Sequence, residues 1–372
     1  MGRGEEMKIP QCAPGRFYGA HSAEMEEAIR KVFAGGWYIL GNEVRAFEEE
    51  FAAWCGCAGA VGVANGTDAL ELALRALRLP EKSRVAVPAL TASATGMAVL
   101  RAGLTPVLVD LDQYRTMSVV SLREAFRFFA DIRAVVPVHL YGQMAALDEI
   151  IPAAAEYGAA VVEDCAQAHG AQLHGRRAGV FGVFGSFSFY PTKNLGAVGD
   201  GGLVTCADAA CCSELEALRQ YGWSERFDSS EFGLNSRLDE LQAAILRVKL
   251  PHLDKDNEKR RFLAARYTAG LTGLPLELPL ERPQSRMVFH QYVIGCECRE
   301  ELRKFLADRG IGTAVHYPKS LAEQQAFAAA SRTELPETER LLPRILSLPM
   351  YPELTEEEAD FVIEAIREFF GA

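Results

Sequence analysis

Short apolar runs alternate with helical stretches from residue 60 to residue 165, and this alternation limits the fold more than any other feature. The apolar runs are continuous, which is typical of buried strands in a parallel sheet covered on both faces. Strands and helices at this spacing predict right-handed βαβ units and a doubly wound α/β sheet. The expected strands are 60–64, 84–88, 106–110, 134–139 and 159–164, and the expected helices are 68–78, 93–102, 121–129 and 146–157.

Polar residues follow several of these strands. In doubly wound sheets, ligands bind beyond the carboxyl ends of the strands. The residues to consider there are Asn65, Asp110, His139 and Asp164.

The chain of 372 residues is longer than a single core usually allows, so we expect two domains. Residues 237–271 indicate two amphipathic helices separated by Pro251. The last ninety or so residues indicate a smaller α+β unit. We therefore predict a large domain over 1–250 and a small C-terminal domain over 251–372.

The charge balance argues against binding to a nucleic-acid polymer, because 39 Lys and Arg against 50 Asp and Glu leave a net charge of −11. No apolar run approaches the roughly 20 residues that span a bilayer. Glu5 and Glu6 occupy positions where a signal peptide needs apolar residues. The nine cysteines form no CxxC pair and have no histidines at zinc spacing. We expect a cytoplasmic protein with reduced thiols and no metal.

Lys193 is the only lysine between Lys82 and Lys249, and it lies among aromatic residues just before a glycine-rich stretch. A lysine desolvated in this way has a lowered pKa and can form a Schiff base. The alternative is an ordinary surface lysine on a loop, and spacing alone leaves both interpretations open.

Two further segments carry groups that could act together with Lys193. Asp164 ends a predicted strand, where an acid can keep the pyridine nitrogen of pyridoxal phosphate protonated, although it can also cap a helix or form a salt bridge. Asn65, Gly66 and Thr67 join a strand directly to a helix, whose first amides can bind a phosphate, although such residues also simply cap helices. Together with Lys193, these segments predict a site for pyridoxal 5'-phosphate.

The sequence resembles the DegT/StrS family of sugar aminotransferases, which have the aspartate aminotransferase fold. The resemblance covers essentially the whole chain. It implies a fold type I structure, in which a mostly parallel central sheet flanked by helices forms the large domain. The motifs that carry it include Asn65–Leu70, Glu163–Gly170, Ser188–Gly196, Asn235–Ala244 and Gly310–Pro318.

The resemblance also implies residue roles. Lys193 would bind the cofactor covalently and move protons, Asp164 would pair with the pyridine nitrogen, and Gln167 would lie beside the ring. The family forms a homodimer with shared active sites, so some of these residues would act on the partner's site. The phosphate ligands would be Gly66, Thr67 and Ser188, with Asn235 and Arg237 from the second subunit, and the sugar pocket would include Tyr190, Tyr221, His316 and Tyr317.

Three further positions are Ala92, His139 and His252. The family commonly has a ring-stacking aromatic residue where this chain has Ala92, so we expect cofactor binding weaker by about 0.5–1.5 kcal/mol unless another side chain covers that face. His139 is expected to have a structural or cofactor-side role. His252 is expected to be a surface residue.

The resemblance implies transfer of an amino group from glutamate or glutamine to a keto group of a nucleotide-linked deoxyhexose. Residues 219–223 and 233–237 favour the branch that acts on 3-keto sugars. Two alternatives are an aminotransferase for a keto-cyclitol and a non-catalytic regulator that binds pyridoxal phosphate. A sugar dehydratase of the same fold replaces the lysine with histidine, and Lys193 argues against it.

Overall fold

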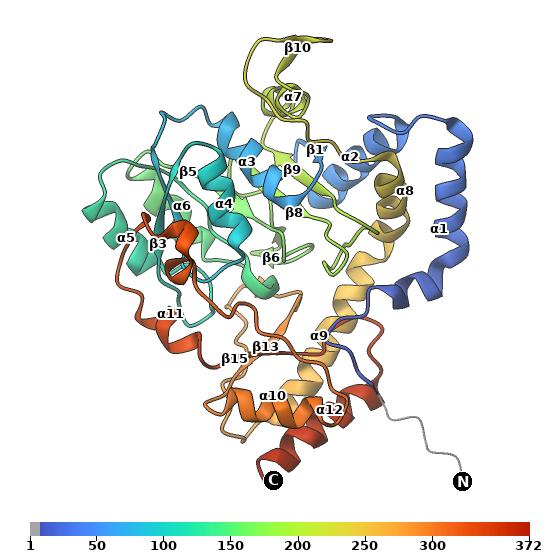
Figure 1. The fold of residues 1–372 in the computed structure, drawn as a ribbon, viewed down its shortest axis with the longest axis vertical. Coiled ribbons are helices and arrows are strands. Elements are labelled where there is room, and N and C mark those ends of the chain that lie inside the picture. The colour runs from blue at the N-terminus through green and yellow to red at the C-terminus, as the bar shows by residue number, and fades with distance from the viewer. Residues whose placement is uncertain (1–7) are drawn as a thin grey trace.

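The computed structural model describes residues 8–372, so the prediction made from Glu5 and Glu6 lies outside it. An eight-stranded sheet in the order β1-β9-β8-β5-β4-β2-β3-β14 forms the centre of the molecule (Figure 1). Only β9 runs antiparallel to its neighbours, so the predicted mostly parallel sheet is confirmed. The strands are β1 (Gly59–Val63), β2 (Arg84–Pro88), β3 (Thr105–Val109), β4 (Ile132–Val135), β5 (Ala160–Asp164), β8 (Phe184–Ser188), β9 (Gly202–Cys206) and β14 (Ser331–Arg332).

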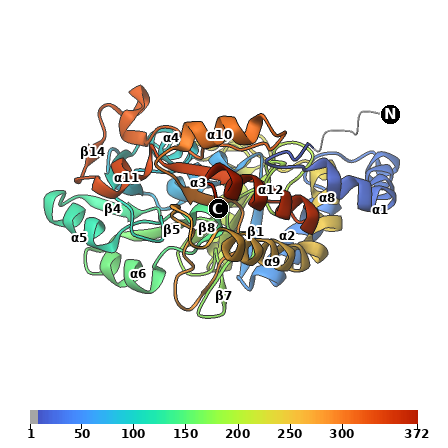
Figure 2. The same ribbon diagram turned by 90° about the horizontal axis from the view of Figure 1, so that it is seen from below.

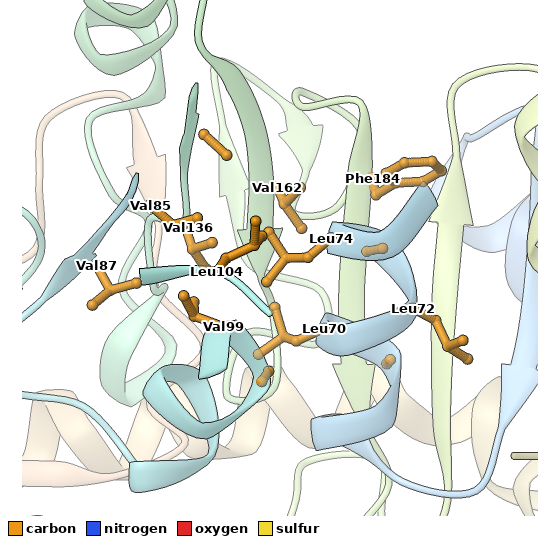
Figure 3. Packing of buried hydrophobic residues seen from close by; sticks show 14 of the residues in the cluster. Leu70, Leu72, Leu74, Val85, Val87, Val99, Leu104, Val136, Val162 and Phe184 are labelled. Atoms are coloured by element: carbon orange, nitrogen blue, oxygen red, sulfur yellow. The ribbon is translucent and has the colours of Figure 1, made fainter. Parts of the chain in front are cut away.

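Helices cover both faces of this sheet (Figure 2). Leu70 and Leu74 on one helix pack in the same cluster as Val85 and Val162 of the sheet (Figure 3). Val161 belongs to a cluster on the opposite face, as expected where successive strand residues alternate in direction. One face carries α3 (Gly66–Ala76), α4 (Ser93–Arg101) and α7 (Ala209–Leu218), and the other carries α2 (Asn42–Cys55), α5 (Val119–Phe128), α6 (Leu147–Ala155) and α8 (Glu240–Lys249).

The strand expected over 134–139 is shorter than predicted, because β4 ends at Val135. Pro137 has no N–H to donate, which interrupts the ladder, although its carbonyl still accepts from the Asp164 amide at 2.9 Å. Beyond it, the chain turns through the short helix η1 (Leu140–Gly142), where Tyr141 has a φ of 59°.

The C-terminal part has its own core, formed by residues such as Tyr267, Tyr292 and Val362. Its elements lie together at the bottom of Figure 1. Ile9 belongs to the same core, whereas β14 returns to the large sheet and pairs with β3. The chain thus crosses between the two parts on both sides of residue 250, and the division into 1–250 and 251–372 stays a prediction. The elements of this part are α9 (Leu253–Leu271), β13 (Tyr292–Gly295), α10 (Arg299–Ala307), β15 (Ile345–Leu348) and α12 (Glu356–Phe369).

The remaining elements are short, apart from one long helix near the N-terminus. Within residues 8–372, no helix has both the length and the apolar character needed to cross a membrane. These elements are α1 (Gly15–Gly35), β6 (Gln172–Leu173), β7 (Arg176–Arg177), β10 (Trp223–Glu225), β11 (Asp228–Ser229), η2 (Leu250–His252), β12 (Ser285–Arg286), η3 (Leu321–Glu323), η4 (Gln325–Phe327) and α11 (Pro336–Leu341).

Glu163, on β5, holds the loop over residues 179–182. Its fully buried carboxylate accepts hydrogen bonds from the backbone amides of Gly179, Phe181 and Gly182 at 2.9, 2.7 and 2.9 Å. It also lies 3.0 Å from Nε2 of His139. This one side chain satisfies four polar groups in a region that water does not reach.

Two of the strand-end residues singled out in the sequence are occupied by such structural contacts. His139 contacts Glu163 through Nε2 and accepts from the Ala145 amide through Nδ1 at 3.1 Å, which supports a structural role. Asp110 accepts from the amides of Glu337 and Thr338 at 2.9 and 2.8 Å and so holds the start of α11.

We expect Glu163→Ala to lower the free energy of unfolding by about 3–5 kcal/mol, because it leaves several buried donors without an acceptor. Chemical denaturation of the purified protein measures this. Glu149→Ala, at an exposed position of α6, is the matched control and should change stability by less than about 0.5 kcal/mol. Equal effects of the two substitutions would contradict the structural role of Glu163.

Candidate active site

A cavity of about 480 Å³ lies beyond the carboxyl ends of β1, β5 and β8. Asn65, Asp164, Ser188 and Lys193 all line it. This volume is within the range of small-molecule sites, and the position agrees with the rule for doubly wound sheets. The fold therefore brings together the three segments that the sequence singled out separately.

Asp164 lies at the base of this cavity and is 4% exposed. Its Oδ2 accepts from the Thr95 hydroxyl at 2.8 Å, and its Oδ1 accepts from the Ala166 amide at 3.1 Å. Burial raises the pKa of Asp164, while these hydrogen bonds and the charge of Lys193 act in the opposite direction. A buried carboxylate fixed in this way is suited to hold a protonated ring nitrogen.

Lys193 follows β8 in a turn and lines the same cavity. Within residues 8–372, its ammonium group forms no hydrogen bond or ion pair. Burial lowers the pKa of Lys193 from 10.5 to about 8, and the charge of Asp164 acts in the opposite direction. A useful fraction of the side chain is therefore a neutral amine near neutral pH, which is the nucleophilic form.

The start of α3 forms an anion cradle. Asn65 caps the helix by accepting from the Asp68 amide at 2.9 Å, which leaves the amides of Gly66 and Thr67 without an acceptor among the described residues. A Cβ added at Gly66 would lie 2.6 Å from Cβ of Ser188, so glycine is what allows the helix start and the end of β8 to approach. The two free amides and the Thr67 and Ser188 hydroxyls are suited to a phosphate.

Gln167 connects the cavity to the C-terminal part of the chain. Its Oε1 accepts from the Tyr141 amide at 2.7 Å, and its Nε2 donates to the Tyr317 hydroxyl at 3.0 Å. Burial raises the pKa of Tyr317 to about 12 and lowers the pKa of His316 to about 4. Nδ1 of His316 lies 2.9 Å from the Ser347 hydroxyl, and neither His316 nor Tyr317 is among the residues that line the cavity.

Tyr190 lines the cavity and is 53% exposed, and it is the only aromatic residue among those that form its wall in the described chain. Ala92 also lines the wall, so no ring stacks from that position. Tyr221 and Asn235 are exposed, and Arg237 lines a separate groove. One chain alone does not bring these last three residues to Lys193.

Sequence reasoning missed the residues that hold these groups in place. Thr95 orients Asp164 from α4, and Lys249 donates from α8 to the Gly196 carbonyl at 2.6 Å. Asn194 donates to Asn257 at 2.8 Å. Thr95 lies one helical turn after Thr91, which is a signal that could have suggested a polar face, but no local pattern indicates the other two contacts.

Comparison with known proteins identifies the type of site. The sequence profile of the DegT/DnrJ/EryC1/StrS aminotransferase family matches residues 20–367. The chain belongs to this family. The suspected family is thus confirmed, and with it the prediction that the chain is an aminotransferase that uses pyridoxal phosphate.

Three similar proteins illustrate the match. The UDP-N-acetyl-3-dehydro-alpha-D-glucosamine 3-aminotransferase of Acidithiobacillus ferrooxidans is 43% identical over 94% of this chain and 95% of its own. The dTDP-3-amino-3,4,6-trideoxy-alpha-D-glucose transaminase of Streptomyces venezuelae is 42% identical over 99% of this chain and 97% of its own. The structure of S. venezuelae DesV in complex with a ketimine intermediate superposes with a TM-score of 0.95 at 42% identity, covering 98% of this chain and 99% of that one.

The cavity fits pyridoxal phosphate on three independent observations. Asp164 is a buried acid with both oxygens oriented, Lys193 is an amine without a partner within residues 8–372, and Gly66 opens a cradle that a Cβ would fill. These are an acid for the ring nitrogen, an amine for the aldehyde and a site for the phosphate. When bound, this cofactor supplies an electron sink for charge at the carbon that carries the amino group.

We expect the Lys193 amine of cofactor-free enzyme to become reactive with a midpoint near pH 8, because burial disfavours its protonated form. Acylation at a series of pH values, read by peptide mass spectrometry against exposed Lys31, measures this midpoint. Asp164→Asn should move the midpoint to lower pH, because the carboxylate stabilises the ammonium ion. A midpoint that rises in this variant would refute the electrostatic coupling.

Proposed function

We propose that this enzyme transfers an amino group from glutamate, or glutamine, to a keto group at carbon 3 of a hexose linked to a nucleoside diphosphate. The observation that carries the proposal is the joint placement of Lys193, Asp164 and the Gly66 cradle in one cavity. The sugar is inferred from two relatives above 40% identity, whose names both place the transferred nitrogen on carbon 3.

Lys193 is the proposed catalytic residue. As a neutral amine it takes a proton from the carbon that carries the amino group, and as an ammonium ion it returns a proton to the carbon on the other side of that nitrogen. A pKa of about 8 makes both forms accessible near neutral pH. Asp164 keeps the ring nitrogen protonated, and Thr95 fixes the orientation of that carboxylate at 2.8 Å.

The remaining residues bind and position the cofactor and the sugar. Gly66, Thr67 and Ser188 hold the phosphate at the start of α3, and Gln167 lies beside the ring. Because Gln167 also contacts Tyr317, we propose that residues 251–372 close the sugar pocket over a cofactor held by residues 1–250. Tyr190, with its ring half exposed at the cavity wall, is placed to contact the sugar.

We also propose that two copies of the chain form a homodimer with shared sites. Trp37, Tyr38 and Phe227 are 67%, 49% and 77% exposed, and they line one groove of about 770 Å³ together with Arg237. Such a group of exposed aromatic residues is typical of an interface. A second copy covering it would carry Asn235, Arg237 and Tyr221 toward a site that they do not reach within one chain.

A cytoplasmic location is consistent with this chemistry. All nine cysteines are free, and free thiols persist in a reducing compartment.

The overall charge of −11 repels an anionic nucleotide, so binding of the nucleotide must rely on local cations.

We expect turnover with a nucleotide-linked 3-keto hexose and glutamate or glutamine, and loss of at least about 1000-fold in kcat for Lys193→Ala, because proton transfer then has no amine. A panel of 3-keto and 4-keto nucleotide sugars and a keto-cyclitol, each with both donors, tests the acceptor. Turnover of the cyclitol alone would overturn the proposed substrate. Bound cofactor without any turnover across the panel would favour a regulator.

Shared sites predict complementation between inactive variants. Lys193→Ala and Arg237→Ala are each expected to lose activity, and a mixture that exchanges subunits should recover about a quarter of wild-type activity, because half of the dimers then hold one intact site. Mixing Lys193→Ala with Lys193→Met is the control and should recover nothing. No recovery in the first mixture, with exchange verified by mass spectrometry, would place Arg237 in its own subunit's site.

A further inference from the structure

Three potential metal ligands, two on α1 and one on η2, lie close together at the surface of the molecule. They are His21, Glu24 and His252, and their ligand atoms all lie within 4.8 Å of one another. Nδ1 of His21 is 3.5 Å from Oε1 of Glu24. Among the described residues, none of these three side chains forms a hydrogen bond, so their ligand atoms remain available.

The fold places these side chains through specific local features. His21 and Glu24 are three residues apart on α1 and so lie on one face of that helix. The helical torsions are interrupted at His21, with φ −128° and ψ 22°, and its ring stacks on Phe17 at 4.4 Å. His252 ends the short helix η2, and its ring centroid lies 4.3 Å from that of His21.

The distances suit a small divalent ion. Zinc bonds of about 2.0–2.1 Å in a tetrahedron place neighbouring ligand atoms about 3.4 Å apart, close to the separation of His21 and Glu24. Two imidazoles and one carboxylate are a ligand set that zinc accepts, with water in the remaining position. Magnesium and calcium prefer oxygen ligands throughout.

A second cluster of potential metal ligands in the described chain is buried and already hydrogen-bonded. His139, Glu163 and Cys165 also lie within 4.8 Å of one another but are fully buried. Both nitrogens of His139 and both oxygens of Glu163 already have partners. Only the surface set offers free ligand atoms and access from solvent.

We propose that His21, Glu24 and His252 bind one Zn²⁺ ion, with water completing the coordination. The ion connects α1 to the junction of α8 and α9. The site is independent of the proposed reaction. The cysteine spacing predicted no metal site, and His252 was expected to be only a surface residue.

This site is connected to the turn that carries Lys193 by direct contacts. Phe17 stacks on His21, and the ammonium group of Lys249 lies 4.7 Å from the centroid of the Phe17 ring. Lys249 also donates to the Gly196 carbonyl at 2.6 Å. Metal binding is therefore expected to stabilise the helices that support the catalytic turn, without placing the ion in the cavity.

Titration of Zn²⁺ into cofactor-loaded enzyme, previously stripped of metal by a chelator, tests the proposal. Isothermal titration calorimetry should show one equivalent bound, and Zn²⁺ should raise the Tm while Mg²⁺ does not. His21→Ala, Glu24→Gln and His252→Ala should each weaken binding by more than about tenfold, since each removes a ligand. His174→Ala, at another exposed histidine, is the control and should bind as the wild type does.

Two outcomes would overturn the proposal. One is the absence of stoichiometric Zn²⁺ binding by the wild-type enzyme. The other is binding that survives His21→Ala and His252→Ala, because that would assign the ion to one of the nine cysteines or another site. The Tm of each metal-free variant and its content of bound cofactor verify that it is folded, so a loss of binding cannot be a loss of structure.

Discussion

Two neighbouring carboxylates at the end of β5 have opposite surroundings, and the site depends on this difference. Glu163 is completely engaged by backbone amides and His139, so it stabilises the loop over residues 179–182. In the described part of the chain, the Asp164 carboxylate accepts only from one hydroxyl and one amide, and it lines the cavity. Glu163 thus fixes the backbone around the end of β5. Because Asp164 is the next residue on that strand, its carboxylate is held where it can contact a ligand in the cavity.

The low dielectric around Asp164 also determines the chemistry of Lys193. Burial disfavours the charge on both groups, whereas the charge of each group stabilises the charged state of the other. The pair therefore combines an acid suited to a cationic ring with an amine that exchanges protons near neutral pH. A more exposed cavity would lose this balance, since water would return the pKa of each group toward its ordinary value.

Much of this arrangement could be predicted from the sequence, because it depends on local patterns. Buried strands followed by polar residues indicated the sheet and its functional edge, and Lys193 was distinctive among many arginines. Strand-end position alone did not separate Asp164 from Asp110 or His139, because their partners come from segments far away in the chain. Thr95 and Lys249 were missed for the same reason. Asn235 and Arg237 act, as we propose, across a subunit boundary that no single chain contains.

The segment that carries Lys193 connects β8 to β9, two paired strands that both lie inside the sheet. Both of its ends are thus fixed in buried strands, and β9 is buried along its whole length. These fixed ends limit how far the segment can move while the two strands stay paired. Asn194, the residue after Lys193, also donates to Asn257 at 2.8 Å and to the Val288 carbonyl at 3.2 Å, so the C-terminal part of the chain holds this turn as well. The sheet and the C-terminal part therefore hold the reactive amine jointly, and a displacement of either one would move it.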